Sequence, residues 1–236
     1  TSVRMSAAQL YDLVFEGNNK WMLSANGTIF TYEYEAIIPG LLKRWYEERQ
    51  EMQRKMRECG DNEIEREYWD KRQLVKKINL NSLYGAILNP GCRFFDIRIG
   101  QSVTLTGRCI TKHMASKVNE IVTGEYDHKG ESIVYGDTDS VYFSAYKTLQ
   151  KEIKDGLIPW TKDSVVGLYD KISEEVNSSF KSFMTKAFHT PATRGEVIAA
   201  GRELVASKGL FITKKRYAVL YYDKEGKRTD VEGKEG

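Results

Sequence analysis

The sequence predicts an α+β protein, in which a mixed or antiparallel sheet is flanked by helices and a pair of antiparallel helices projects from it. Three observations lead to this prediction. Two long helical patterns, at 39–58 and 63–84, are separated only by the break at 59–62. β-formers flank a tight polar turn within 133–143, and a run rich in β-branched and aromatic residues occupies 209–222.

The composition is that of an ordinary globular protein. The chain has 236 residues, of which 41% are hydrophobic and 29% charged, so it can bury a core as one large domain or two modest ones. Its formal net charge of +3 does not by itself demand a nucleic-acid partner, which only local clusters of cations could indicate. No run of residues is long enough to span a membrane, and no signal peptide opens the chain.

Cysteine and histidine usage narrows the protein class further. The three cysteines, Cys59, Cys92 and Cys109, include no C-x-x-C pair and predict reduced thiols in an intracellular protein. The three histidines are scattered, which argues against a zinc site. The chain starts at Thr1 rather than Met and stops at 232–236 without a closing element, which indicates a piece of something longer.

The N-terminal part is expected to be mainly helical. A short helix at 6–15 precedes a hairpin in which Asn26-Gly27 supplies the positive φ angles of a type I′ turn. Asn62 and Glu65 resemble a capping pair at the start of the second long helix. Two helices of similar length then form an antiparallel hairpin, which is too thin to bury a core of its own. The first of them has an apolar stripe at Leu41, Leu42, Trp45, Met52 and Met56.

The remaining sequence is expected to form the larger part of the fold, from which that helical hairpin projects. Helices are predicted at 97–123 and 163–186, the second of them closed by Pro191. Strands are predicted at 196–200 and 209–222. Together with the hairpin at 133–143, these elements form the predicted sheet and its covering helices.

The polar turn within 133–143 carries two carboxylates at its tip. Asp137 and Asp139 lie two positions apart, so both side chains can project from the same side of an extended segment. Like charges this close repel unless a cation lies between them, and oxygen ligands suit Mg²⁺ or Mn²⁺. A bare D-x-D is more often a polar turn whose carboxylates cap the backbone, so the rest of the chain has to decide between the two.

One face of the second long helix combines cationic, amide, aromatic and bare positions, at Gln73, Lys77, Asn81, Tyr84 and Gly85. A glycine beside a tyrosine lets a flat partner, such as a base, approach closely. If the two helices are antiparallel, Arg49 and Lys77 could converge on one anion such as a polyphosphate. The alternatives are a solvated charge for Lys77 and an ion pair with Glu47 or Glu51 for Arg49.

A third cluster consists of three adjacent cations and an aromatic residue, Lys214, Lys215, Arg216 and Tyr217. It is placed at the start of a strand, is preceded by Lys208, and predicts a segment that contacts phosphates. As an isolated run, such a cluster is more often a solvated edge that discourages strand pairing. Glu196, at the start of the preceding predicted strand, is a candidate third carboxylate near the Asp pair.

Three motifs in these clusters resemble those of one enzyme family, the family B DNA polymerases. Residues 77–85, KINLNSLYG, resemble its K-x-x-x-N-S-x-Y-G helix, residues 135–140 match its Y-G-D-T-D-S hairpin, and residues 214–217 match its K-K-R-Y strand. The motifs follow one another in the family's order, and the likeness covers nearly the whole chain. Their spacing and flanks look most similar to the replicative polymerases of tailed bacteriophages.

The resemblance implies template-directed DNA synthesis from deoxynucleoside triphosphates (dNTPs) on a primer–template, with two Mg²⁺ ions, or Mn²⁺, as cofactors. Asp139 would bind both metals, with Asp137 in a lesser role and Glu196 as a further candidate ligand. The incoming nucleotide would be held by Arg49, Lys77, Asn81 and Tyr84. The DNA would be contacted by Gly85, Lys214, Lys215, Arg216 and Tyr217, with Lys215 near the primer end. The catalytic residues would be Asp137, Asp139, Lys77 and Lys215.

The resemblance also implies a division into a palm, formed by 1–37 and 91–236, and a fingers hairpin at 38–90. Closing the fingers onto the substrate would gate the chemistry. The protein would act in the cytoplasm, that of a host cell if it is viral, and without a membrane.

The match departs from the family pattern in ways that limit the isolated chain. The D-x-x-S-L-Y-P-S motif, which supplies a second metal-binding aspartate, is absent, as are the exonuclease and thumb segments. Gln53 also stands where relatives often carry a second cation. A partner chain or missing segments would have to supply these parts, so we expect the chain alone to be weak or inactive as a polymerase.

Two alternative functions remain open. One is a non-catalytic nucleic-acid-binding or assembly half of a split polymerase. The other is a nuclease that uses the Asp pair, which is poorly supported because no further carboxylates or general base accompany the pair in the sequence.

Overall fold

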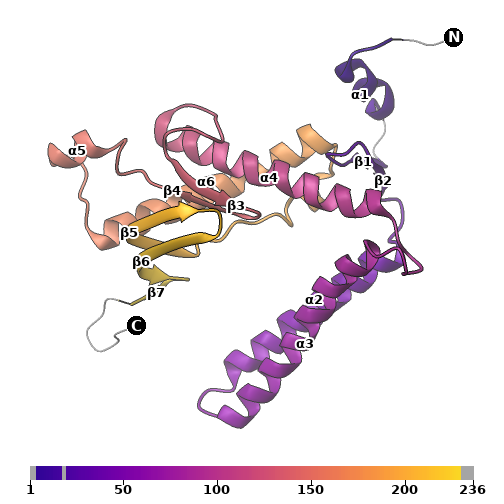
Figure 1. The fold of residues 1–236 in the computed structure, drawn as a ribbon, viewed down its shortest axis with the longest axis horizontal. Coiled ribbons are helices and arrows are strands. Elements are labelled where there is room, and N and C mark those ends of the chain that lie inside the picture. Colours follow the sequence, from indigo (N-terminus) through magenta and orange to yellow (C-terminus); the bar gives the residue numbers. More distant parts are fainter. Residues whose placement is uncertain (1–3, 18–19, 230–236) are drawn as a thin grey trace. The chain divides into compact units, whose positions relative to one another are not determined.

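The computed structural model describes residues 4–17 and 20–229, which contain seven helices and seven strands. The chain divides into two compact units, Thr1–Thr104 and Leu105–Gly236, and the division falls inside helix α4 (Ile97–Thr123) (Figure 1). Helices combined with antiparallel strand pairs confirm the predicted α+β class.

In the first unit, two long helices, α2 (Ile37–Glu58) and α3 (Glu63–Ile87), lie side by side and confirm the predicted helical hairpin (Figure 1). Asn62 caps α3 by accepting the Glu65 N–H at 3.2 Å, as the capping pattern predicts. The contacts between the helices show that they are antiparallel, because Trp45 meets Lys76, Arg49 meets Gln73, and Lys55 meets Trp69.

Little of this hairpin is buried within the described chain. No residue of α2 is buried, and the buried residue of α3 is Ile87 at its C-terminal end. The helices are joined instead by side-chain contacts such as the Lys76–Glu48 ion pair and the Lys55 ammonium, 4.6 Å from the centroid of a tryptophan ring. The hairpin therefore has no core of its own, as the sequence indicates.

The remaining elements of the first unit are short: α1 (Ala7–Phe15), β1 (Trp21–Leu23) and β2 (Ile29–Thr31). Ser6 caps α1 in a reciprocal capping box with Gln9. Both the helix and the hairpin were predicted at these positions.

The turn between β1 and β2 differs from its prediction. Gly27 has a positive φ of +83°, but Asn26 does not, so the turn is not type I′ and the loop spans 24–28. The Asn26 side chain accepts a hydrogen bond from the Ser24 hydroxyl and donates one to the Arg98 carbonyl at 3.0 Å. These bonds hold Asn26 in a wider loop, and sequence spacing alone could not reveal them.

The second unit is built around a core shared by α4 and α6 (Lys162–Phe188). Val118 of α4 packs with a stripe at helical spacing on α6, formed by Ile172, Val176 and Phe180. Each of these four residues is at most 4% exposed. Ile133 and Phe143, one from each arm of the Asp hairpin, pack against this cluster and so fix the hairpin to the core.

The strands of this unit form two small antiparallel sheets. One pairs β3 (Ile133–Asp137) with β4 (Ser140–Phe143). The other has the order β5 (Leu204–Thr213), β6 (Arg216–Lys224) and β7 (Lys227–Arg228). The hairpin at 133–143 is confirmed, although Val134 on its first arm is half exposed rather than buried.

Two strand predictions were wrong. Residues 196–200 follow the short helix α7 (Ala192–Gly195) and form no strand. The predicted strand 209–222 is instead parts of two strands joined by a tight turn at Lys214 and Lys215. The sequence does not indicate this turn, because Lys215 adopts a φ of +63°, a conformation in which glycine or asparagine is usually found.

The other helices of the second unit agree better with the sequence. The helix predicted at 97–123 has those bounds, and the one predicted at 163–186 is longer by one residue at its start and two at its end. A short helix, α5 (Gln150–Lys154), was not predicted. Among the described residues, no helix is long and apolar enough to cross a membrane.

Candidate active site

The Asp hairpin places two carboxylates at one tight turn. Asp137 ends β3 and pairs with Ser140 across the turn, which leaves Thr138 and Asp139 as the two central residues. Thr138 has a φ of +44°, an uncommon conformation for a β-branched residue. Such a conformation persists only where the surroundings hold it in place.

Three side-chain hydrogen bonds hold this turn, and in one of them the Thr138 hydroxyl donates to the Asp137 Oδ1 at 3.2 Å. Thr111 of α4 donates its hydroxyl to the Thr138 carbonyl at 2.9 Å, which ties the tip of the hairpin to the helix. Ser140 donates its hydroxyl to the Asp137 carbonyl at 3.1 Å, inside the turn. The two carboxylates therefore stand on a turn that is fixed from both sides.

The two carboxylates have different surroundings. The Asp137 side chain is 20% exposed, and its Oδ2 lies 3.4 Å from the Lys215 ammonium. Asp139 is exposed, and within the described chain no ion pair reaches its carboxylate. Asp139 is therefore the carboxylate better able to take a cation from solution, whereas the charge of Asp137 is already partly balanced.

This pair of carboxylates fits a magnesium ion that is shared with a substrate. Mg²⁺ is usually bound through one or two carboxylates, and waters and substrate phosphates complete its six positions. Among the described residues, no group of three or more His, Cys, Asp or Glu side chains could hold a metal ion.

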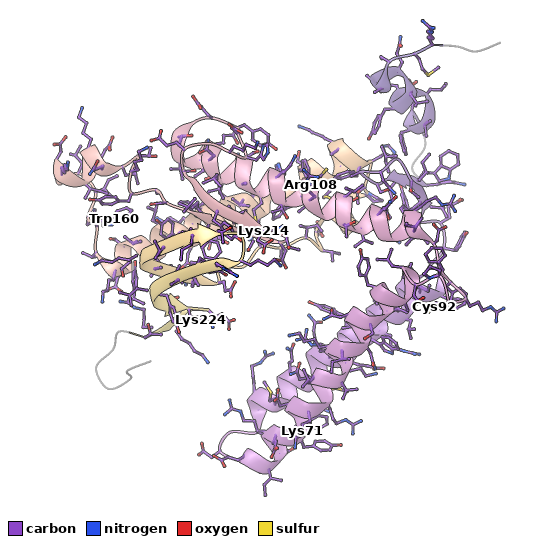
Figure 2. The ribbon with its side chains drawn as sticks, viewed as in Figure 1. Lys71, Cys92, Arg108, Trp160, Lys214 and Lys224 are labelled. Carbon is purple, nitrogen blue, oxygen red and sulfur yellow. The ribbon has the colours of Figure 1, made fainter. Side chains whose placement is uncertain are left out.

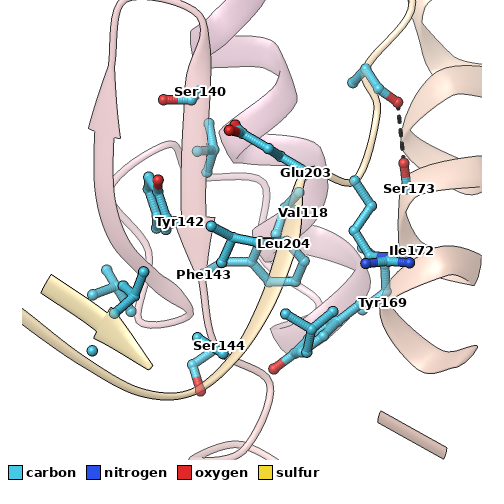
Figure 3. A pocket seen from close by; sticks show the side chains of 18 of the residues that line it. Val118, Ser140, Tyr142, Phe143, Ser144, Tyr169, Ile172, Ser173, Glu203 and Leu204 are labelled. Atoms are coloured by element: carbon cyan, nitrogen blue, oxygen red, sulfur yellow. Dashed lines mark hydrogen bonds between the residues drawn. The ribbon is translucent and has the colours of Figure 1, made fainter. Parts of the chain in front are cut away.

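A cavity of about 500 Å³ lies beside Asp139. It is lined by β4, α6 and the segment 199–209, and Figure 3 shows Val118, Phe143 and Ile172 among its apolar side chains. Glu203 contributes a second carboxylate to the lining. Sequence reasoning missed Glu203, because it belongs to no motif and lies outside the predicted strands.

The cavity wall at 199–203 is irregular but well anchored. The Asn177 side chain of α6 exchanges two hydrogen bonds with the backbone of Ala200, at 2.8 and 2.7 Å. Arg202 binds Asp170 of α6 and, at 2.5 Å, the buried Asp223 of β6. Of these contacts, those at Ala200 lie within the strand that the sequence predicted at 196–200, and they are made to a side chain of α6 and not to a neighbouring strand.

Glu196 forms an ion pair with Lys181 in this structure, and not with a group of the Asp137–Asp139 turn. It lies at the end of α7, where its carboxylate accepts a hydrogen bond from the Lys181 ammonium at 2.6 Å. Its role as a metal ligand stays a prediction.

The basic cluster forms the tip of the β5–β6 hairpin. Thr213 pairs with Arg216, so Lys214 and Lys215 are the turn itself and β6 begins at Arg216. Figure 2 labels Lys214 at this turn. All three cations are exposed, as is Tyr217, and the Lys215 ammonium reaches the Asp137 carboxylate. The structure thus brings the basic motif and the carboxylate motif together.

In the first unit, Arg49 links the two long helices. Its Nε donates to the Gln73 Oε1 at 3.2 Å, and Lys77 follows one turn later on the same face of α3. Glu51, one of the two alternative partners of Arg49, is bound to Arg54 at 2.6 Å. Arg49 is half-buried and Lys77 is exposed, so this face offers two cationic side chains to an anion.

The C-terminal end of α3 carries the aromatic and bare positions of the same motif. Tyr84 is half-buried and donates its hydroxyl to the Gly100 carbonyl at 3.2 Å, which fixes α3 to the start of α4. Gly85 and Asn81 are exposed, and among the described residues, apart from the chain neighbours of Gly85 and the backbone of its own helix, no heavy atom lies within 4 Å of the point that a Cβ of Gly85 would occupy. A flat partner can therefore approach Gly85 without a clash.

Comparisons with known proteins agree with these motifs. The chain matches the family model described as DNA polymerase family B over residues 7–235. A DNA-directed DNA polymerase of Escherichia phage RB69 is 33% identical over 168 residues, which are 66% of this chain and 18% of the relative. DNA polymerase 1 of Pyrococcus abyssi is 28% identical over 201 residues, which are 85% of this chain and 21% of the relative. A DNA-directed DNA polymerase of Enterobacteria phage T4 is 30% identical over 168 residues.

The motifs, their order and the carboxylate turn place the chain in the class of nucleic-acid polymerases. The match over nearly its whole length is more specific: the chain belongs to DNA polymerase family B. Phage and archaeal relatives match at similar identity, so the comparisons do not single out the phage enzymes. The chain spans roughly a fifth of the length of these curated relatives.

Proposed function

We propose that this chain is the nucleotidyl-transfer portion of a family B DNA polymerase, which adds nucleotides from dNTPs to a primer 3′-hydroxyl as directed by a template. The observation that carries the proposal is the fixed turn of Asp137 and Asp139 with the Lys215 ammonium 3.4 Å from the first carboxylate. In this assignment, residues 1–37 and 91–236 are the palm and residues 38–90 are the fingers. The proposed compartment is the cytoplasm, that of a host cell if the protein is viral.

The carboxylates are the proposed metal ligands. Asp139 is the principal one because it is exposed and free of ion pairs within the described chain, and Asp137 assists from the strand side of the turn. When bound, Mg²⁺ would make the primer hydroxyl a better nucleophile and balance charge on the phosphates. Lys215 then has two tasks, which are to offset the charge of Asp137 and to hold the primer end.

The α2–α3 hairpin is the proposed nucleotide-binding element. Arg49 and Lys77 bind the triphosphate, since a guanidinium fork and an ammonium suit phosphate oxygens. Asn81 lies one turn beyond Lys77, and the Tyr84 ring lies under the new base pair, where the bare Gly85 lets a base approach. Template and primer also meet the basic turn at Lys214, Lys215, Arg216 and Tyr217.

We further propose that the isolated chain is incomplete as an enzyme. The proposed metal site has two carboxylates on one turn, and the D-x-x-S-L-Y-P-S motif that would add another is not in the sequence. A partner chain or further segments would supply that aspartate, together with the exonuclease and thumb. Substrate binding can therefore survive in this chain where turnover does not.

Nucleotide binding tests the proposal. We expect Mg²⁺ to strengthen the binding of a dNTP to the chain, and Asp139→Asn to remove that Mg²⁺ dependence. Asp155→Asn is the matched control, because Asp155 is an exposed aspartate of the second unit outside the proposed site. Titration calorimetry with and without Mg²⁺ measures both. Salt-sensitive DNA binding that ignores Asp139 and Lys77 would instead support a non-catalytic binding module.

A further inference from the structure

Four aromatic rings join the β3–β4 hairpin to the β5–β6 hairpin. Tyr135 and Tyr142 come from the first hairpin, and Phe211 and Tyr217 come from the second. Every pair among the four has ring centroids between 5.2 and 6.0 Å apart, within the range of favourable aromatic contacts. The cluster thus fixes the basic turn relative to the carboxylate turn.

Two tyrosine hydroxyls of this cluster make different contacts. Tyr142 donates its hydroxyl to the Tyr217 hydroxyl at 3.1 Å, so this bond stays within the cluster. The Tyr135 hydroxyl instead accepts the backbone N–H of Lys215 at 2.8 Å. Tyr135 is therefore the ring that reaches the turn residue itself.

Lys215 needs such a partner because of its backbone. Its φ of +63° is unfavourable for a residue with a side chain, and it occupies one of two turn positions between Thr213 and Arg216. A glycine would be the usual residue at a position of this kind, but a glycine has no ammonium. The hydrogen bond that the Lys215 N–H donates to the Tyr135 hydroxyl favours the conformation that lets a lysine occupy the turn.

The Lys215 ammonium therefore lies beside the Asp137 carboxylate and is still exposed enough to bind an anion from solution. The Lys215 Nζ lies 3.4 Å from the Asp137 Oδ2, and the Lys215 side chain is 68% exposed. An exposed ammonium has three donors, so one can face Asp137 while the others reach a phosphate.

We propose that Tyr135 is a positioning residue, whose hydroxyl fixes the backbone of Lys215 so that its ammonium lies between the Asp137 carboxylate and the DNA backbone. The first half of this statement concerns contacts within the chain. The second half rests on the proposed function, because it takes the anion to be a primer phosphate.

The first experiment tests the contact without DNA. Lysines are reductively methylated with ¹³C-formaldehyde and a borane or cyanoborohydride reductant, and the Lys215 signal is identified by its loss in Lys215→Met. We expect Asp137→Asn to shift this signal in the wild-type background and in Tyr142→Phe, but not in Tyr135→Phe. Tyr142→Phe is the matched control, since it also removes one hydroxyl from the cluster but leaves the bond to Lys215.

Amide exchange adds a second readout on the same variants. We expect the Lys215 N–H to exchange about tenfold faster in Tyr135→Phe, since it loses a hydrogen bond of ordinary strength, and at the wild-type rate in Tyr142→Phe. An unchanged exchange rate in Tyr135→Phe, or an unchanged response of the Lys215 signal to Asp137→Asn, would overturn the proposal.

The second experiment tests the consequence for DNA. Fluorescence anisotropy of a labelled primer–template gives Kd as a function of salt. We expect Lys215→Met to reduce the slope of log K against log salt by about 0.9, the value for one phosphate contact. Tyr135→Phe should lower the slope in the Lys215 background and have no effect in the Lys215→Met background.

The two experiments separate the two ideas. If Lys215→Met leaves DNA binding unchanged while the methyl-lysine and exchange results are as expected, the positioning contact stands and the assignment of the anion as DNA is wrong. If Lys215→Met weakens DNA binding but Tyr135→Phe has the same effect with and without Lys215, the DNA assignment stands and the positioning role is wrong.

Discussion

The proposed functional residues lie in two parts of the molecule, and the interactions that stabilise one part differ from those that stabilise the other. The carboxylate turn of the second unit stands on a core in which Val118, Ile172, Val176 and Phe180 are at most 4% exposed. The α2–α3 hairpin has no buried residue in α2 and relies on ion pairs, capping and ring contacts along its shared face. Burial stabilises far more per residue than exposed ion pairs do.

This difference suggests a division of labour. The proposed metal ligands need fixed geometry, and a close-packed core supplies it. A helical pair without a core is expected to open more readily, and elements that close on ligands are usually drawn from the less stable parts of a fold. The predictions below test whether the two parts differ in this way.

The largest expected effect on stability comes from creating a cavity in the core of the second unit. Phe180 is 1% exposed, and we expect Phe180→Ala to reduce the free energy of unfolding by about 3–5 kcal/mol. Leu74→Ala on α3 is the comparison, since Leu74 is 46% exposed and should change stability by less than about 0.5 kcal/mol. Urea unfolding measures both, and similar losses for the two variants would contradict the comparison.

A smaller loss of stability is expected when the buried polar network around Asn119, which bonds to the start of the carboxylate hairpin at Ser132, is disrupted. Asn119 is fully buried, donates to the Glu125 carbonyl at 2.8 Å, and accepts from the Ser132 N–H and hydroxyl at 3.1 and 2.8 Å. Asn119→Ala leaves the Ser132 N–H and hydroxyl without their acceptor and should cost about 1–3 kcal/mol, although the Glu125 carbonyl keeps a hydrogen bond from the Asp127 N–H.

The same network gives a control for this prediction. Ser132→Ala removes only the hydroxyl donor and keeps the backbone N–H that bonds to Asn119. It should therefore reduce the free energy of unfolding by less than Asn119→Ala does. Equal costs in urea unfolding would mean that the Asn119 amide is not the centre of the network.

The next effect depends on pH. Burial lowers the pKa of His113, and the nearby Lys117 lowers it further while Glu120 opposes the shift. The folded state therefore binds fewer protons than the unfolded state just below pH 6.5, the ordinary histidine value. Stability should fall as the pH drops through 6.5 and level off below the folded pKa.

Histidine replacement isolates this contribution. In the structure the His113 ring bonds to the Tyr126 and Ser179 hydroxyls and stacks on Phe183. His113→Gln should be less stable at neutral pH but should lose most of the slope of stability against pH between 5 and 7. A slope that persists in this variant would assign the effect to another group.

The smallest effect is expected in the helical hairpin. The Lys76–Glu48 ion pair joins α2 to α3, and its hydrogen bond lowers the pKa of the partly exposed Glu48. Glu48→Gln should leave global unfolding almost unchanged and increase amide exchange only in α2 and α3. An effect on exchange in α6 would show that the two units do not respond separately.

The sequence was most informative where one local pattern decides the structure. The helix at 97–123 and the capping pair at Asn62 follow from spacing and side-chain chemistry within a few residues, and both were predicted correctly. The Asp turn was predicted too, because β-formers flank a Gly-Asp-Thr-Asp sequence. Each of these features can be recognised without knowing what lies beside it in the fold.

The errors arose where distant residues decide the structure. The turn at Lys214 and Lys215 carries no glycine, and its conformation depends on the Tyr135 hydroxyl, 80 positions away. The segment 196–200 has the composition of a strand, but the Asn177 side chain of α6 bonds to the backbone of Ala200, and the N–H groups of Val197 and Ile198 bond to carbonyls of α7. Glu203 joins the lining of the cavity beside Asp139 only through the fold.

Primer extension tests the central claim, that this chain holds part of a polymerase site, most directly. A short primer–template, four dNTPs and Mg²⁺ are incubated with the chain alone, and with the chain plus a separately made upstream fragment that carries the missing aspartate. We expect extension only in the mixture, and its loss when the chain carries Asp139→Asn. Full extension by the chain alone would mean that a local carboxylate such as Glu196 or Glu203 completes the site. It would contradict the account of an incomplete metal site.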